Sequence, residues 1–129
     1  MTRDGLRANV LVVEDDAELL EVLCRAFEGS GHTVLRASCG DAGLRLFRAE
    51  PPDLVICDII MPDRDGIELI PEMKALQPGV KIVAISGRQM IGGLDVLHLA
   101  ARLGADATLA KPFQVDELMT LASGLLAAA

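Results

Sequence analysis

The stretch VLVVEDD, residues 10–16, sets the fold class of this chain. Four apolar residues are followed at once by three acids, Glu14, Asp15 and Asp16. A short continuous apolar run that ends in polar residues is typical of a strand buried on both faces. The apolar residues that follow, over residues 19–27, recur at helical spacing. This segment therefore predicts a buried strand followed directly by a helix.

The same pattern occurs five times along the chain. Apolar runs at residues 10–13, 33–37, 54–57, 80–85 and 107–110 predict strands, and helical spacing follows each run, the fourth helix including Leu94. Glycine or proline ends the first four helical stretches, at residues 29–31, 51–52, 78–79 and 104. Strands that alternate with helices predict an α/β fold, a doubly wound five-stranded parallel sheet with right-handed crossovers and helices on both faces.

Length and composition favour one small domain. The chain has 129 residues, of which half are hydrophobic and a quarter charged, so we expect a single domain over residues 1–129 with a core from about residue 9 to about residue 127. Aromatic residues are scarce, with three Phe, no Trp and no Tyr. The core must therefore be built from aliphatic side chains.

The charge and the hydropathy of the chain exclude several classes of function. A net charge of -7 without a basic stripe argues against direct nucleic-acid binding. No segment is apolar enough for a membrane span, and residues 1–9 lack the apolar part of a signal peptide. Cys24, Cys39 and Cys57 have no metal-ligand spacing and leave one thiol unpaired in any disulfide scheme, which fits a reducing compartment. We expect a cytoplasmic protein.

Polar residues follow four of the five predicted strands. Glu14, Asp15 and Asp16 follow the first, Asp58 the third, Ser86 the fourth, and Lys111 the fifth. In doubly wound sheets, ligands bind outside the carboxyl ends of the strands. The expected topology brings these residues to one edge of the sheet.

Each of these residues also has a purely structural explanation. Asp16 precedes a helix and suits its N-cap, and Glu14 and Asp15 suit the positive end of the helix dipole. Ser86 before a glycine suits a turn, and Lys111 suits an exposed surface. Asp58 is harder to explain in this way, because apolar residues follow it where a solvated turn would be polar. Taken together, the structural explanations require several coincidences at one edge.

Adjacent carboxylates at this edge need a counter-charge. Two carboxylates about 4 Å apart repel by roughly 4 kcal/mol at an effective dielectric near 20, so they either protonate or hold a cation. Oxygen ligands without nearby His or Cys favour Mg²⁺ over zinc. A carboxylate beside such an ion can attack phosphorus and form an acyl phosphate. Lys111 would then stabilise the charge on the transferring oxygens.

Other catalytic schemes are poorly supported. Ser86 can donate a hydrogen bond to a phosphoryl oxygen but has no evident base, because His32 and His98 lie outside the predicted edge. We expect both histidines to be surface residues. The chain contains no P-loop motif.

With these residues assembled, the chain resembles the receiver domains of two-component response regulators, from about residue 9 to the last helix. The resemblance rests on five segments in order, VLVVEDD at 10–16, DIIMPDRDG at 58–66, ISG at 85–87, LGAD at 103–106 and KPF at 111–113. It implies a CheY-like, flavodoxin-like (βα)5 fold with strand order 2-1-3-4-5. It also implies a phosphohistidine donor on a sensor histidine kinase or a phosphotransfer protein.

The resemblance assigns roles to individual residues. It implies that Asp58 is the phosphoacceptor, that Asp15 binds Mg²⁺ (or Mn²⁺) directly, and that Glu14 acts on the metal largely through water. It further implies that the backbone carbonyl of Ile60 completes the metal ligands. Ser86 and Lys111 would contact the phosphoryl group, and the Lys111–Pro112 peptide would be cis, which proline makes accessible.

The chain departs from the family pattern in two places. Thr108 stands three residues before Lys111, where many receivers carry the aromatic residue that reports phosphorylation. The segment 86–104 is about three residues longer than is common, and the extra length falls in RQMIGG at 88–93, so we expect a remodelled loop and fourth helix. Within this loop, Arg88 occupies a position that modulates the lifetime of the aspartyl phosphate in the family.

Two alternatives compete with a phosphorylated signalling module. One is a pseudo-receiver, an interaction domain that works without phosphorylation, to which Thr108 and the long loop point. The other is a Mg²⁺-dependent aspartyl phosphatase, but such enzymes often carry D-x-D after the first strand and a cap domain, and this chain has E-D-D. The downstream protein target, and whether the receiver stands alone or is a fragment, stay open. Many receivers form homodimers through the fourth helix, the fifth strand and the fifth helix.

Overall fold

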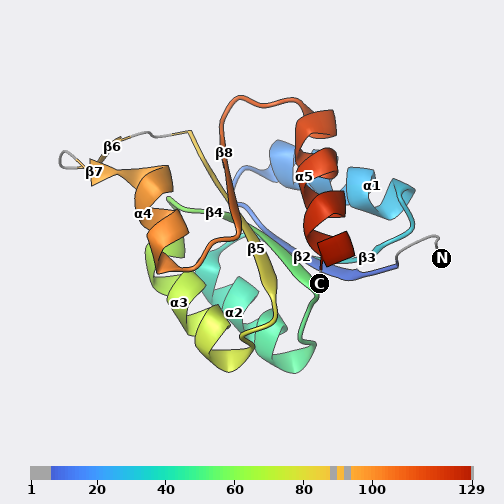
Figure 1. The fold of residues 1–129 in the computed structure, drawn as a ribbon, viewed down its shortest axis with the longest axis horizontal. Helices are drawn as coiled ribbons and strands as arrows, with labels where there is room; N and C mark the ends of the chain where they lie inside the picture. The colour runs from blue at the N-terminus through green and yellow to red at the C-terminus, as the bar shows by residue number, and fades with distance from the viewer. Residues whose placement is uncertain (1–6, 88–89, 92–93, 129) are drawn as a thin grey trace.

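The computed structural model describes residues 7–87, 90–91 and 94–128. Its main sheet has five parallel strands in the order β3-β2-β4-β5-β8 (Figure 1). The strands are β2 (Asn9–Val13), β3 (Thr33–Ala37), β4 (Leu54–Asp58), β5 (Lys81–Ser86) and β8 (Ala107–Ala110). Numbered among themselves, they follow the order 2-1-3-4-5, and the predicted fold class is confirmed.

Five helices cover the two faces of this sheet. They are α1 (Ala17–Gly29), α2 (Gly40–Ala49), α3 (Gly66–Leu76), α4 (Val96–Leu103) and α5 (Val115–Ala128). Helices α2, α3 and α4 lie on one face, and α1 and α5 lie on the other (Figure 1). No helix in the described part of the chain is both long enough and apolar enough to cross a membrane.

The central strands are apolar because both of their faces are buried. In β2, Leu11 and Val13 pack in the layer of α2, α3 and α4, whereas Val10 and Val12 pack with α1 and α5. Successive side chains of a strand point to opposite faces, so a strand between two helical layers needs apolar residues at every position. This requirement made the strands recognisable as continuous apolar runs.

The helix boundaries follow the local chemistry of the sequence. The Asp16 side chain caps α1 by accepting hydrogen bonds from the N–H groups of Glu18 and Leu19 at 3.0 and 3.3 Å, which confirms the N-cap interpretation. On the opposite face of the sheet, α4 stops before Gly104, whose φ of 126° is a left-handed conformation that glycine adopts without strain.

The long segment before α4 differs from the expectation. Leu94, which was assigned to the helix, instead lies in the two-residue strand β7 (Leu94–Asp95), which pairs antiparallel with β6 (Met90–Ile91). The Asp95 carboxylate accepts a hydrogen bond from the His98 N–H and so fixes the start of α4 at Val96. An expected loop thus contains a small β ladder.

His32 lies at the amino-terminal edge of the sheet, away from the polar strand ends. Its Nδ1 accepts a hydrogen bond from the Ala8 N–H at 3.0 Å, and its ring lies against Phe27. Burial lowers the pKa of His32, because desolvation disfavours the charged imidazolium. His98, by contrast, is exposed on α4.

We predict that His32 makes the domain less stable in acid. A histidine with a lowered folded-state pKa binds fewer protons in the native state, so its contribution is present above the unfolded pKa, near 6.5, and is lost as the pH falls. Replacing His32 with Gln should cost about 1 kcal/mol near pH 8 and less near pH 5. Urea unfolding at both pH values measures the difference. His98→Gln is the control, and an equal cost of His32→Gln at both pH values would contradict the assignment.

Candidate functional site

The sheet brings the predicted polar residues to one edge. Glu14 directly follows β2, Asp58 ends β4, Ser86 ends β5, and Lys111 directly follows β8. The register aligns Asp58 with Ile85 and Ser86 with Ala110, so these strands end side by side. Residues far apart in the sequence therefore meet at the carboxyl ends of neighbouring strands.

Three carboxylates form the centre of this edge. Glu14, Asp15 and Asp58 each place a carboxylate oxygen within 4.8 Å of the others. Glu14 is fully buried and Asp58 is 4% exposed, whereas Asp15 is open to solvent. Backbone N–H groups orient two of them, because Asp16 donates to Glu14 Oε2 at 3.0 Å and Ile60 donates to Asp58 Oδ1 at 3.2 Å. The predicted acids thus share one site that is open on the side of Asp15.

One lysine faces these carboxylates. Lys111 Nζ lies 2.8 Å from Glu14 Oε1 and 3.1 Å from Asp58 Oδ2, and its side chain is half-buried. The contact with Glu14 Oε1 is a close ion pair without hydrogen-bond alignment, and this buried oxygen accepts no hydrogen bond from any described residue. With all groups ionised, one ammonium opposes three carboxylates, and the site carries an excess of negative charge.

The burial of these charges shifts their pKa values. Desolvation, with a smaller contribution from the charge of Asp58, raises the pKa of Glu14 to about 7 against the lowering effects of Lys111 and of the Asp16 N–H. Burial lowers the pKa of Lys111, but its interactions with Glu14 and Asp58 outweigh the burial, and the net pKa is raised. The lysine therefore stays charged, and the buried acid is the group that most needs another cation.

The donor set fits a hard divalent cation. It consists of carboxylate oxygens, and Glu14 Oε1 is a buried acceptor with unused capacity. The three cysteines are free, and the nearest to the acids in sequence, Cys57, is fully buried with its pKa raised by burial. The site can therefore hold an ion such as Mg²⁺. The metal-binding role of the Ile60 carbonyl stays a prediction.

The remaining predicted residues surround this centre. Ser86 is buried, and its backbone carbonyl accepts a hydrogen bond from the Lys111 N–H at 2.9 Å. The Lys111–Pro112 peptide is cis, as the resemblance implied. Thr108 lies half-buried in β8, where it pairs with Ala84. Arg88 lies outside the described residues.

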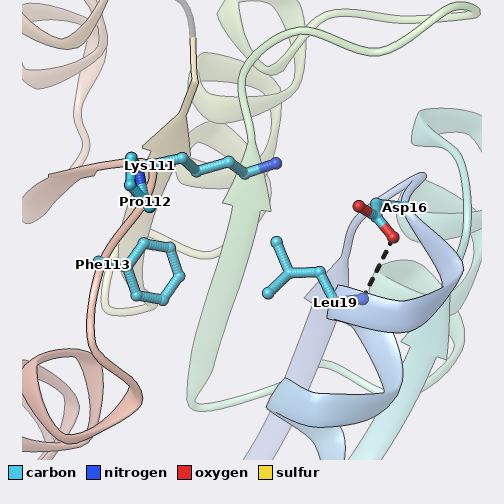
Figure 2. Close-up of a pocket in the computed structure, with 5 residues that line it drawn as sticks. All are labelled: Asp16, Leu19, Lys111, Pro112 and Phe113. Carbon is cyan, nitrogen blue, oxygen red and sulfur yellow. Dashed lines mark hydrogen bonds between the residues drawn. The ribbon is translucent and has the colours of Figure 1, made fainter.

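A surface hollow of about 360 Å³ opens beside Lys111. It is lined by residues of α1 and of the segment after β8, namely Asp16, Leu19, Lys111, Pro112 and Phe113. In Figure 2 the Phe113 ring and the Leu19 side chain face each other across this hollow, and the Lys111 side chain extends over it. Leu19 was not among the predicted site residues, although Leu19 lies about one helical turn after the N-cap Asp16.

Gly66 packs directly against the backbone of Asp58 and Ile59. A Cβ on Gly66 would lie 2.9 Å from Ile59 Cα and 3.0 Å from the Asp58 carbonyl oxygen. The Gly66 N–H also donates to the Ile59 carbonyl oxygen at 2.7 Å. The start of α3 thus approaches the end of β4 so closely that only glycine fits. Gly66 ends the DIIMPDRDG motif at residues 58–66, but its close approach to the Asp58 backbone is not visible in the sequence.

We predict that Gly66→Ala displaces the Asp58 segment. The added methyl group would overlap backbone atoms that cannot rotate away, so the free energy of unfolding should fall by about 1–3 kcal/mol. Amide shifts in two-dimensional NMR spectra should change at residues 58–66. Gly79→Ala is the matched control, because no atom lies within 4 Å of the Cβ position there. Equal free energies of unfolding and equal amide shifts in the two variants would show that the close contact at Gly66 does not constrain the Asp58 segment.

The fold and the site define a class of protein. A family model of the response regulator receiver domain matches residues 10–123. The chain therefore belongs to the CheY-like response regulator receiver domain family of two-component signalling. Its cluster of Glu14, Asp15 and Asp58 is consistent with the phosphoacceptor site of such a domain.

Individual relatives agree with this family. The chain is 30% identical over 113 residues to sporulation initiation phosphotransferase F of Bacillus subtilis (strain 168), covering 88% of this chain and 89% of that protein. A CheY-like receiver domain protein from Methanospirillum hungatei JF-1 has a similar structure, with a TM-score of 0.87, 27% identity, and coverage of 95% of this chain and 96% of that one. The transcriptional regulatory protein GlrR of Escherichia coli (strain K12) is 33% identical over 111 residues, 86% of this chain but 24% of the regulator.

Proposed function

We propose that the chain is a single receiver domain that accepts a phosphoryl group on Asp58 with the help of Mg²⁺ (or Mn²⁺) and then changes its binding to other proteins. The observation that carries this proposal is the Asp58 carboxylate, which is nearly buried, held by Lys111 and by the Ile60 N–H, and grouped with two further carboxylates. The domain would catalyse its own phosphorylation and dephosphorylation and act on no separate substrate.

The chemistry is a transfer between two nucleophiles. An Asp58 carboxylate oxygen attacks the phosphorus of a phosphohistidine, the new O–P bond forms as the P–N bond breaks, and the imidazole nitrogen keeps the electron pair and takes up a proton. Lys111 offsets the negative charge of the phosphoryl oxygens, and the Ser86 hydroxyl donates a hydrogen bond to one of them. Glu14, Asp15, Asp58 and the Ile60 carbonyl would hold the cation, which supplies further charge neutralisation when it is bound.

The partners follow from the family and from its named relatives. We propose a sensor histidine kinase or a phosphotransfer protein as the donor, since the name of the Bacillus subtilis relative describes phosphoryl transfer. Such donors act in the cytoplasm, where we place this domain. A downstream protein target receives the signal, and a homodimer through α4, β8 and α5 is a further arrangement open to the domain.

Thr108 favours a second candidate function. Without the aromatic residue that many receivers have there, either loop movement alone carries the switch or the domain is a pseudo-receiver that binds partners without phosphorylation. The grouped carboxylates and Lys111 favour the phosphorylated module. A domain that only binds partners does not require a buried carboxyl group with a raised pKa, such as Glu14, beside a lysine.

We predict that acetyl phosphate and Mg²⁺ place one phosphoryl group on Asp58. Intact-mass spectrometry of the wild type should show one adduct that is absent with EDTA and absent from Asp58→Asn. Asp116→Asn, which alters an exposed acid on α5, is the matched control and should be modified like the wild type. An unmodified wild type, or the same adduct on Asp58→Asn, would refute the proposal.

We also predict that Arg88→Ala changes the lifetime of the aspartyl phosphate. Arg88 follows the ISG segment that adjoins the phosphorylation site, at a position that modulates this lifetime in the family. The rate of phosphate loss after removal of the donor, followed by intact mass, measures the effect. An unchanged rate would remove Arg88 from the mechanism.

A further inference from the structure

A second set of charged residues lies on the flank formed by α2 and α3, outside the Asp58 site. A hollow of about 310 Å³ opens there and is lined by Asp41, Leu44, Arg45, Arg48 and Arg64. The helices α2 and α3 run side by side on the same face of the sheet (Figure 1). Three guanidinium groups thus gather at one hollow in a chain whose net charge is -7.

The arginines at this hollow are only partly neutralised. Arg48 Nη2 and Arg64 Nη2 share the Glu72 carboxylate, at 3.1 and 2.7 Å, and Arg64 Nη1 lies 3.7 Å from Asp41. Arg45 forms no ion pair with any described residue. Since each guanidinium has five N–H donors, one shared carboxylate leaves most of them available. Arg64 pairs with both Glu72 and Asp41, whereas Arg48 pairs with Glu72 alone and Arg45 with no described residue, so the guanidinium groups of α2 are the less neutralised ones.

A more apolar hollow shares Arg48 with this charged one. It measures about 210 Å³ and is lined by Phe47, Arg48, Pro51, Leu76 and Gln77. Leu76 is 50% exposed, an unusual exposure for a large apolar side chain in the described part of this domain. Arg48 lines both hollows, and the two are called here the α2–α3 groove, with guanidinium groups in one hollow and apolar side chains in the other.

We propose that this α2–α3 groove docks an acidic amphipathic segment of a partner protein. An apolar side chain of the segment packs on Leu76, Phe47 and Pro51. Carboxylates one helical turn away bind Arg45 and Arg48, which lie three residues apart and so point to the same side of α2. Arginine suits this role because its planar group binds a carboxylate through two parallel hydrogen bonds.

Charge and shape favour a protein segment over a small anion. Asp41 lines the charged hollow, and Glu72 pairs with Arg48. These two acids repel a doubly charged free phosphate more strongly than a singly charged carboxylate. A protein segment can also place its carboxylates beside Arg45 and Arg48 only. The apolar hollow adds binding area for a side chain and none for an ion. The groove uses none of the residues of the Asp58 site, so this proposal holds whether or not Asp58 is phosphorylated.

The test is a selection from a displayed random peptide library, with peptides of about twelve residues. The wild-type domain is the bait, and the selected binders are then measured on an Arg45→Glu/Arg48→Glu variant whose fold is checked by NMR. The selected peptides should combine a Leu, Ile or Phe with at least two acids. They should bind the double variant roughly tenfold or more weakly than the wild type. Arg102→Glu, a single charge reversal on α4, is the control and should bind like the wild type.

NMR titration and competition with pyrophosphate test whether the selected peptide binds in the α2–α3 groove. Titration of the labelled domain with a selected peptide should shift amides of α2 and α3, and inorganic pyrophosphate should neither reproduce these shifts nor displace the peptide. The proposal is overturned by an absence of binders, by peptides without acids, by equal binding to the double variant, or by shifts confined to other helices. Competition by pyrophosphate, or self-association of the domain through the same amides, would assign the groove to a different occupant and also overturn it.

Discussion

The crowding of Glu14, Asp15 and Asp58 around a single ammonium group is the constraint on which the rest of this domain depends. Two carboxylates at about 4 Å repel by roughly 4 kcal/mol at an effective dielectric near 20, which is a large share of the stability of a small domain. Two separate chain segments, the one after β2 and the end of β4, must therefore be held in place against this repulsion. The parallel sheet does so, because β2 and β4 are fixed on both sides by backbone hydrogen bonds and on both faces by packed helices.

Burial shifts the pKa values of these crowded groups. Glu14 is completely buried, and its pKa is raised to about 7, so its ionised form is favoured only when positive charge is close. Lys111 supplies part of that charge from β8, and its own pKa is raised by the same contacts. Glu14 Oε1 is paired with Lys111 but accepts no aligned hydrogen bond from the described residues, so it has capacity for a further cation. The grouped carboxylates are able to bind a divalent metal ion.

Most of the fold could be predicted, because strands buried on both faces are continuous apolar runs, and because caps such as Asp16 act locally. The site residues could be found for a related reason, since the carboxyl ends of parallel strands share one edge. The β6–β7 ladder could not be predicted, because two-residue strands are too short to leave a periodic pattern in the sequence. Contacts across elements, such as Gly66 on the Asp58 backbone or Arg48 and Arg64 on Glu72, depend on how the helices pack, and single-chain patterns do not record that packing.

The loop after Asp58 connects the two charged regions of the molecule. Asp63 in this loop accepts hydrogen bonds from the N–H groups of Gly40 and Asp41, at 3.0 and 2.9 Å, so its carboxylate caps α2 from another segment. These N–H groups hold the pKa of Asp63 well below its usual range, so the cap stays ionised. The next residue, Arg64, reaches into the α2–α3 groove. A few residues of backbone join Asp58 to Asp63, so this loop is covalently attached to the end of β4 and hydrogen-bonded to the start of α2. Residues 58–64 thus connect the acidic edge of the sheet to the arginine-lined flank through the chain itself and through the cap of α2.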